Sequence, residues 1–186
     1  MASGYKFPIL DSLGNPTTTI VDFEDMFVPK ELFDDSGIFG WGGNSFGQLG
    51  LGNQTDMSIP SQIGSLTNWL NIEAEQYYSL SIKTDGTLWS WGFNNVGQLG
   101  LGDRTNRSSP VQVGSLTNWK SVDSGSNHTV AIKTDGTLWS WGYNNVGQLG
   151  LGDRTDRSSP VQVGSLTNWK FVSGGIQHSL GITYSD

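Results

Sequence analysis

The stretch GTLWSWGFNNVGQLGLGDRTNRSSPVQVGSLTNWK at residues 86–120 returns fifty residues later, at 136–170, with 33 of its 35 positions identical. A more divergent copy, GIFGWGGNSFGQLGLGNQTDMSIPSQIGSLTNWL, precedes them at 37–70. Repetition at a fixed period is the signature of a repeat architecture, and it outweighs any single motif in deciding the fold. The repeated part of the chain divides into three periods, 37–86, 87–136 and 137–186.

Each period alternates short β-prone runs with turn residues. Trp89-Ser90-Trp91 alternates bulky and small side chains, as a half-buried strand does. Residues 97–102 are too rich in glycine for a helix and predict tight turns with positive φ. Lys133–Gly136 carries the Asp-Gly sequence of a hairpin turn, and Pro110 opens a further short strand over 111–113. About four strands and no helix per 50 residues predict one blade of a propeller.

The order LWSWGxNxxGQLGLGDxxxxSSPVQV, followed by Trp, a His-Ser or His-Thr step and, in the middle copy, AIKTDG, resembles the repeat of the regulator of chromosome condensation family. The resemblance covers about 150 of the 186 residues. It implies a β-propeller with four-stranded blades, and members of this family typically close a ring of seven. We therefore expect an all-β fold of three four-stranded propeller-type blades, preceded by a non-repeat N-terminal arm.

Three blades are too few for a ring of their own, since propellers usually have four to eight. An open arc exposes the faces of both end blades, and apolar patches of that kind normally bind a partner. Self-association, with two copies forming a six-bladed ring, is the favoured hypothesis. The alternatives are a flat arc docked on another protein, or repeats that pack without forming a ring.

Residues 1–36 share nothing with the repeat and carry a net charge of −5, out of −7 for the whole chain. A segment of this length cannot bury its aromatic side chains alone. We therefore predict a docking arm, folded over the first blade or attached to a larger assembly. Its candidate contact residues are Phe23, Met26, Phe27, Leu32 and Phe33.

The leader, from GYKFPIL through DFEDMFVPKELF directly into a repeat beginning with Trp-Gly, resembles that of virion proteins of tailed phages. This second resemblance implies a structural protein of a phage particle, in the tail or tail-fibre region. The arm would be its anchor and the blades a platform for other virion proteins or for a host glycan or receptor. The repeat family implies a different function, a soluble cytoplasmic regulatory or guanine-nucleotide-exchange module. Glycan binding at aromatic blade tips is a third hypothesis.

Two loops of mixed charge, 103–107 and 153–157, are candidates for binding an anionic glycan or an acidic chain, although a simple solvated loop is the alternative. The first repeat has Gln54 and Met57 in place of the arginines. The segments 71–81, 121–131 and 171–181 diverge between repeats, either by drift or because their neighbours differ. The residues singled out in the loops are Arg104, Arg107, Arg154 and Arg157; those placed at seams between blades or chains are Tyr77, Tyr78 and Phe171.

The remaining composition argues against several function classes. The chain has no Cys, so disulfides and thiolate metal sites are excluded. His128 and His178 occupy equivalent positions one period apart, so blade symmetry keeps them from converging on a metal; we expect each to bond a neighbouring turn. No catalytic pair, cofactor motif or basic stripe for nucleic acid is recognisable, and we expect no enzyme activity. No apolar run is long enough for a signal peptide or a membrane span.

Overall fold

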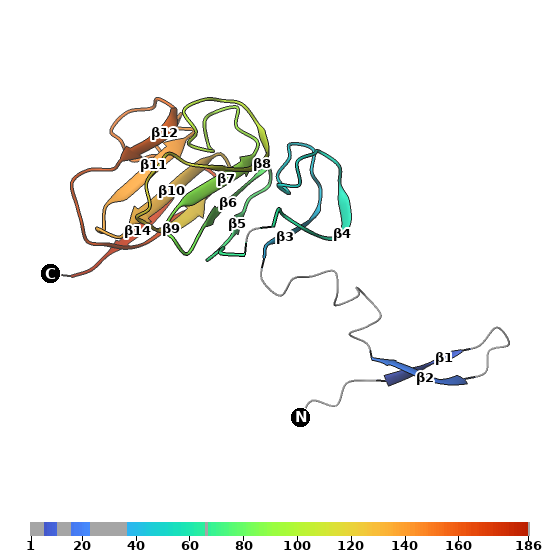
Figure 1. Cartoon of the computed structure of the whole chain (residues 1–186). Helices are drawn as coiled ribbons and strands as arrows, with labels where there is room; N and C mark the ends of the chain where they lie inside the picture. The colour runs from blue at the N-terminus through green and yellow to red at the C-terminus, as the bar shows by residue number, and fades with distance from the viewer. Residues whose placement is uncertain (1–5, 11–15, 23–36, 66, 186) are drawn as a thin grey trace. The chain divides into compact units, whose positions relative to one another are not determined.

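The computed structural model describes residues 37–65 and 67–185, and the backbone of 6–10 and 16–22 (Figure 1). Backbone contacts divide the chain into two compact units, Met1–Ser36 and Gly37–Asp186. In the first unit, β1 (Lys6–Leu10) pairs antiparallel with β2 (Pro16–Asp22). The candidate contact residues of the arm all lie outside the described residues.

The second unit consists of twelve antiparallel strands, four from each period, and the described residues contain no helix. The all-β propeller-type class is therefore confirmed. The strands are β3 (Phe39–Gly42), β4 (Met57–Gln62), β5 (Glu73–Ala74), β6 (Tyr78–Ile82), β7 (Leu88–Gly92), β8 (Arg107–Gln112), β9 (Trp119–Ser124), β10 (His128–Lys133), β11 (Leu138–Gly142), β12 (Arg157–Gln162), β13 (Trp169–Gly174) and β14 (Ser179–Thr183).

The sheets straddle the borders of the periods. Strands β5-β6-β7-β8 form one four-stranded sheet and β9-β10-β11-β12 another, whereas β3-β4 and β13-β14 are two-stranded. Each complete blade thus takes its first two strands from the end of one period and its last two from the start of the next. The unit is a row of two complete blades with a half-blade at each end, and Figure 1 shows β3 and β4 at one end of that row.

The larger apolar core fills the seam between the two complete blades. Side chains of β6 and β7 pack there against side chains of β9, β10 and β11. This packing buries apolar side chains from both blades. The buried members are Tyr78, Leu80, Ile82, Leu88, Leu99, Val113, Trp119, Val122, Ala131 and Trp141.

One buried asparagine organises each glycine-rich loop. The Asn94 side-chain amide donates to the carbonyl oxygens of Asp103 and Thr105, both at 3.1 Å, and its oxygen accepts from Leu99 N at 2.9 Å. Asn44 and Asn144 repeat this arrangement. The predicted positive φ angles are present, at +85°, +72° and +83° for Gly97, Gly100 and Gly102.

Pro110 lies inside β8 and does not open it, because the strand begins three residues earlier, at Arg107. β8 is the outermost strand of its sheet. A missing amide donor is tolerated at such an edge.

Candidate functional site

The turns and loops at one end of the sheets form a rim that carries most of the candidate residues. Because neighbouring strands are antiparallel, the β5–β6 turn and the long β7–β8 loop leave the sheet at the same end. The equivalent segments of the other periods do the same. We call this surface the loop rim; it comprises the turns 75–77, 125–127 and 175–178 and the loops 43–56, 93–106 and 143–156.

An aromatic cluster lies on the loop rim where the first half-blade meets the first complete blade. The ring of Phe46 lies 5.0 Å from that of Tyr77 and 4.5 Å from that of Phe93, measured between centroids. All three side chains are half-buried, and the Tyr77 hydroxyl accepts a hydrogen bond from Gln76 Nε2 at 2.8 Å. The next period has Val, Asn and Tyr at these positions, so the cluster belongs to this seam alone.

Three of the four candidate arginines form ion pairs. Arg107 contacts Asp103 at 2.6 Å, and the equivalent pair Arg157–Asp153 is 2.5 Å apart. A Thr105 backbone N–H, and then the Arg107 guanidinium, hold the pKa of Asp103 below its usual range. Partly exposed pairs of this kind contribute little to stability.

The other two arginines differ from each other in their partners. Arg104 reaches the next blade, 3.5 Å from Asp156, while more than half of its own side chain stays exposed. Arg154 forms no ion pair with any residue the structure describes. The loop arginines therefore add exposed hydrogen-bond donors to the rim.

Tyr78 and Phe171 have opposite environments. Tyr78 is fully buried, and its hydroxyl lies 2.8 Å from Gly125 O and 2.6 Å from His128 O of the next blade. Burial raises the pKa of this phenol. Phe171, on β13, is 58% exposed. Tyr78 thus joins two blades of one chain, while Phe171 is accessible at the C-terminal end.

His128 also joins two blades. Its Nε2 lies 2.9 Å from Ser179 Oγ, which donates its own proton to Gln148 O. The hydroxyl oxygen therefore accepts from Nε2, and Nδ1 is left without a partner among the described groups. The partner is a strand residue of the next blade, where we had expected a turn. Burial, and secondarily the nearby His178, lowers the pKa of His128 to about 4.

This buried imidazole predicts a pH dependence of stability. An unfolded histidine titrates near pH 6.5, so between pH 6.5 and 4 the unfolded chain binds a proton that the folded chain does not. The contribution is complete above pH 6.5 and is lost as the pH falls towards 4, up to about 3 kcal/mol. Urea denaturation of His128→Gln between these pH values should show a shallower fall than the unsubstituted chain. The variant His178→Gln should keep most of the original slope, because burial is the larger cause of the lowered His128 pKa; equal slopes for both variants would contradict the prediction.

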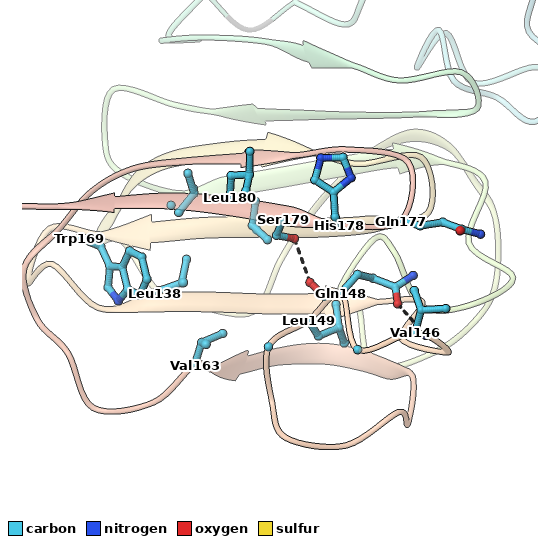
Figure 2. A pocket seen from close by; sticks show the side chains of 15 residues that line it. Leu138, Val146, Gln148, Leu149, Val163, Trp169, Gln177, His178, Ser179 and Leu180 are labelled. Carbon is cyan, nitrogen blue, oxygen red and sulfur yellow. Dashed lines mark hydrogen bonds between the residues drawn. The ribbon is translucent and has the colours of Figure 1, made fainter.

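Both ends of the row of blades are hollowed. A cavity of about 350 Å³ lies beside the C-terminal half-blade, where Trp169 packs with Leu138 and Val163, and Ser179 bonds Gln148 (Figure 2). A second, of about 270 Å³, lies at the N-terminal end and is lined by Trp41 and Ile72, among others. Each cavity lies beside a sheet that has two strands among the described residues, β13-β14 for the first and β3-β4 for the second.

Two further observations concern the described residues. No group of three or more His, Cys, Asp or Glu side chains is placed there to hold a metal ion. No helix of this part of the chain is long and apolar enough to cross a membrane.

Comparison with solved structures shows the same architecture in larger proteins. Prp20p from Saccharomyces cerevisiae, in a study of its binding to Gsp1p and histones, is 26% identical over 83% of this chain, with a TM-score of 0.71. Yeast RCC1 (Prp20) bound to Kap60 gives 26% identity over 83% of the chain and 0.72. Human WBSCR16, at 23% identity over 82% of the chain and 0.68, shows the fold alone. The chain spans about two fifths of the length of these proteins, 42%, 40% and 41% respectively.

The sequence itself matches the family described as "Regulator of chromosome condensation (RCC1) repeat" three times, at residues 35–82, 85–132 and 135–182. A second description of the same repeat matches 119–148. No curated protein is similar enough in sequence to count as a relative. None of these matches bears on the phage resemblance of the leader, which stays a prediction. The three matches cover more than half of the chain, which therefore belongs to the RCC1 repeat family.

Proposed function

We propose that this chain is a non-enzymatic, regulatory protein-binding module whose partner contacts the loop rim. One observation carries the proposal: the rim presents the Phe46–Tyr77–Phe93 cluster at the same end of the sheets as the loop arginines. Aromatic and arginine side chains supply most of the binding energy in protein interfaces. The cluster is half-buried, so its rings are held in place before a partner arrives and lose little conformational freedom on binding.

The structural relatives support a protein partner. Prp20p was studied for its binding to Gsp1p and to histones, and yeast RCC1 was solved with Kap60. The present chain corresponds to about two fifths of those proteins, so their partners serve here as probes for the proposal.

Immobilised full-length chain, titrated with Gsp1p and with histones, tests the proposal by biolayer interferometry. We expect saturable binding of one of them, and at least about a tenfold loss of affinity in Tyr77→Ala and Phe93→Ala, as for hot-spot aromatics. Leu166→Ala is the matched control, because Leu166 is exposed but lies at the other end of the sheets. Absence of binding, or equal affinities for the rim and control variants, would count against the proposal.

Guanine-nucleotide exchange is the second candidate, favoured by the similarity to Prp20p, which binds Gsp1p. It is distinguished by the release of labelled GDP from a small GTPase. Faster release with the unsubstituted chain, lost in Tyr77→Ala, would support exchange. Binding without faster release would leave the binding module alone as the function.

A further inference from the structure

Charge is distributed unevenly among the three repeats. The window 37–82 contains three acidic residues, Asp56, Glu73 and Glu75, and no Lys or Arg. The matching windows 87–132 and 137–182 each contain two acidic and three basic residues. With histidine neutral, the first repeat therefore carries a net charge of −3, whereas each of the other two carries +1.

Two of these acids lie at or beside the turn that carries Tyr77. Glu75 belongs to the turn 75–77 of the loop rim, and its carboxylate accepts a hydrogen bond from Gln76 N at 3.1 Å. Glu73 lies on β5, the strand that enters this turn. Burial, and secondarily the nearby Asp123 on β9 of the next blade, raises the pKa of Glu73. Like charges therefore repel each other across the boundary between the two complete blades.

No basic side chain of the described residues balances these carboxylates. Glu73, Glu75 and Asp123 form no ion pair in that part of the chain. Arg104 and Arg107, the arginines of the adjoining loop, each contact a different carboxylate. A cation from outside the chain would relieve the repulsion, and salt screens partly buried charges less than fully exposed ones.

The Phe46–Tyr77–Phe93 cluster lies at the same turn. Its rings contact one another, and all three residues are half-buried, so part of each stays accessible to a partner. The equivalent turns of the other repeats, Gly-Ser-Asn at 125–127 and Gly-Ile-Gln at 175–177, have neither an aromatic nor an acidic residue. We call the cluster, together with Glu73 and Glu75, the acidic aromatic surface.

The chemistry of this surface matches an arginine side chain. A guanidinium group is attracted to the face of an aromatic ring and binds a carboxylate through two parallel hydrogen bonds. A lysine ammonium has the charge but lacks the planar fork that makes both contacts. A neutral segment would leave the carboxylates unbalanced, and an acidic segment would add to their repulsion.

We propose that the acidic aromatic surface binds an arginine-bearing, basic segment of a partner protein. The inference rests on the proposed function, because it names the partner chemistry for one part of the same loop rim. One guanidinium stacks on the ring of Tyr77 and pairs with Glu75, and a neighbouring basic side chain of the segment reaches Glu73. The rings supply the contact area, and the carboxylates select the sign of the charge.

Fluorescence anisotropy of a labelled peptide of repeated Gly-Arg units, titrated with the full-length chain, tests this chemistry. We expect saturable binding that weakens as salt is added, since salt screens opposite charges near a surface. A peptide of repeated Gly-Lys units should bind at least about fivefold more weakly, because its ammonium groups cannot form the two-bond pair. Absence of binding by the Gly-Arg peptide, or equal affinities for the two peptides, would overturn the proposal.

Substitutions at the turn locate the binding surface. Glu75→Gln should weaken binding of the Gly-Arg peptide at least about fivefold, as expected for a lost hydrogen bond between charged groups. Tyr77→Ala should weaken it at least about tenfold, whereas Tyr77→Phe, which keeps the ring, should retain the original affinity. An unchanged affinity in both Glu75→Gln and Tyr77→Ala would place the peptide elsewhere and exclude this surface.

Asp85→Asn is the matched control for the loss of charge. Asp85 lies in the turn between β6 and β7, at the other end of the same blade, and it is exposed. Asparagine keeps the side-chain oxygen that accepts from Thr87 N. The control should bind the Gly-Arg peptide as the unsubstituted chain does. Equal losses in Asp85→Asn and Glu75→Gln would show that only the total charge matters, and would overturn the assignment to this surface.

The same variants separate this inference from the proposed function. If Gsp1p or a histone binds and Tyr77→Ala weakens it but Glu75→Gln does not, the loop rim is a binding site and the basic partner is wrong. If neither protein binds but the Gly-Arg peptide does, with the losses given above, the chemistry of the surface stands and the evidence counts against the proposed function alone.

Discussion

Trp91→Ala is expected to lower the free energy of unfolding by about 3–5 kcal/mol, as for other buried tryptophans. The Trp91 side chain is fully buried, packs against Trp69, and donates through Nε1 to Gln48 O. Removing it opens a cavity in the seam between the first half-blade and the first complete blade, and it leaves a carbonyl with one partner fewer. Urea denaturation at neutral pH measures the loss.

The repeat supplies a matched control at Trp41, which occupies the same position one period earlier but is mostly exposed. Trp41→Ala should cost less than about 1 kcal/mol, because the side chain that it removes is mostly exposed. Similar losses for the two variants would show that position within the repeat, and not burial, determines the effect.

Gly136→Ala is expected to destabilise the chain by at least about 3 kcal/mol, because two costs add. The residue has a φ of +77°, which is unfavourable for any side chain, and it closes the turn between β10 and β11. A Cβ atom there would also lie 2.0 Å from the backbone oxygen of Thr167. The backbone at 167 must therefore move, together with the start of β13.

Gly114→Ala separates these two costs. Gly114 has a φ of +62°, but nothing lies within 4 Å of an added Cβ atom. We expect a loss of about 1–2 kcal/mol from backbone strain alone. Thermal denaturation of the two variants gives the comparison, and a loss for Gly114→Ala as large as that for Gly136→Ala would contradict the steric argument.

Most of the local structure could be predicted from the period and its turn residues. The runs at 89–91, 119–122 and 129–132 lie within strands, and Gly97, Gly100 and Gly102 have the positive φ angles expected. Strand pairing across the Asp-Gly turn is local, so the sequence is sufficient to find it. The borders of the blades could not be predicted from the sequence in the same way. Strand β8 pairs with β7 across a long loop, and the strand that follows it, β9, belongs to a new sheet. The first residue of a sequence repeat can be chosen anywhere in the period. Only the pairing between strands shows where one blade ends and the next begins.

The candidate site residues were likewise only partly predictable from the sequence. Tyr77 and Tyr78 are adjacent in sequence and were singled out together, yet one lies in a surface cluster and the other is fully buried. The alternation of side chains along a strand separates the two faces of its sheet. It does not show which of these faces a neighbouring blade will cover. Sequence reasoning missed Phe46 and Phe93, although both are aromatic where the corresponding residue of another period is not. The mixed charge of the loop 103–107 is visible in the sequence, but only the structure shows that Arg107 pairs with Asp103.

The sequence by itself determined the repeat family, the strands, the turns and the number of blade equivalents, because these depend on local preferences repeated every fifty residues. Only the tertiary structure decided that the described residues of 37–186 form two complete blades and two half-blades. Equivalent residues such as Trp41 and Trp91 have the same local sequence but different neighbours, and burial depends on neighbours. Which indole is core and which is surface is therefore decided by the blade that packs against it.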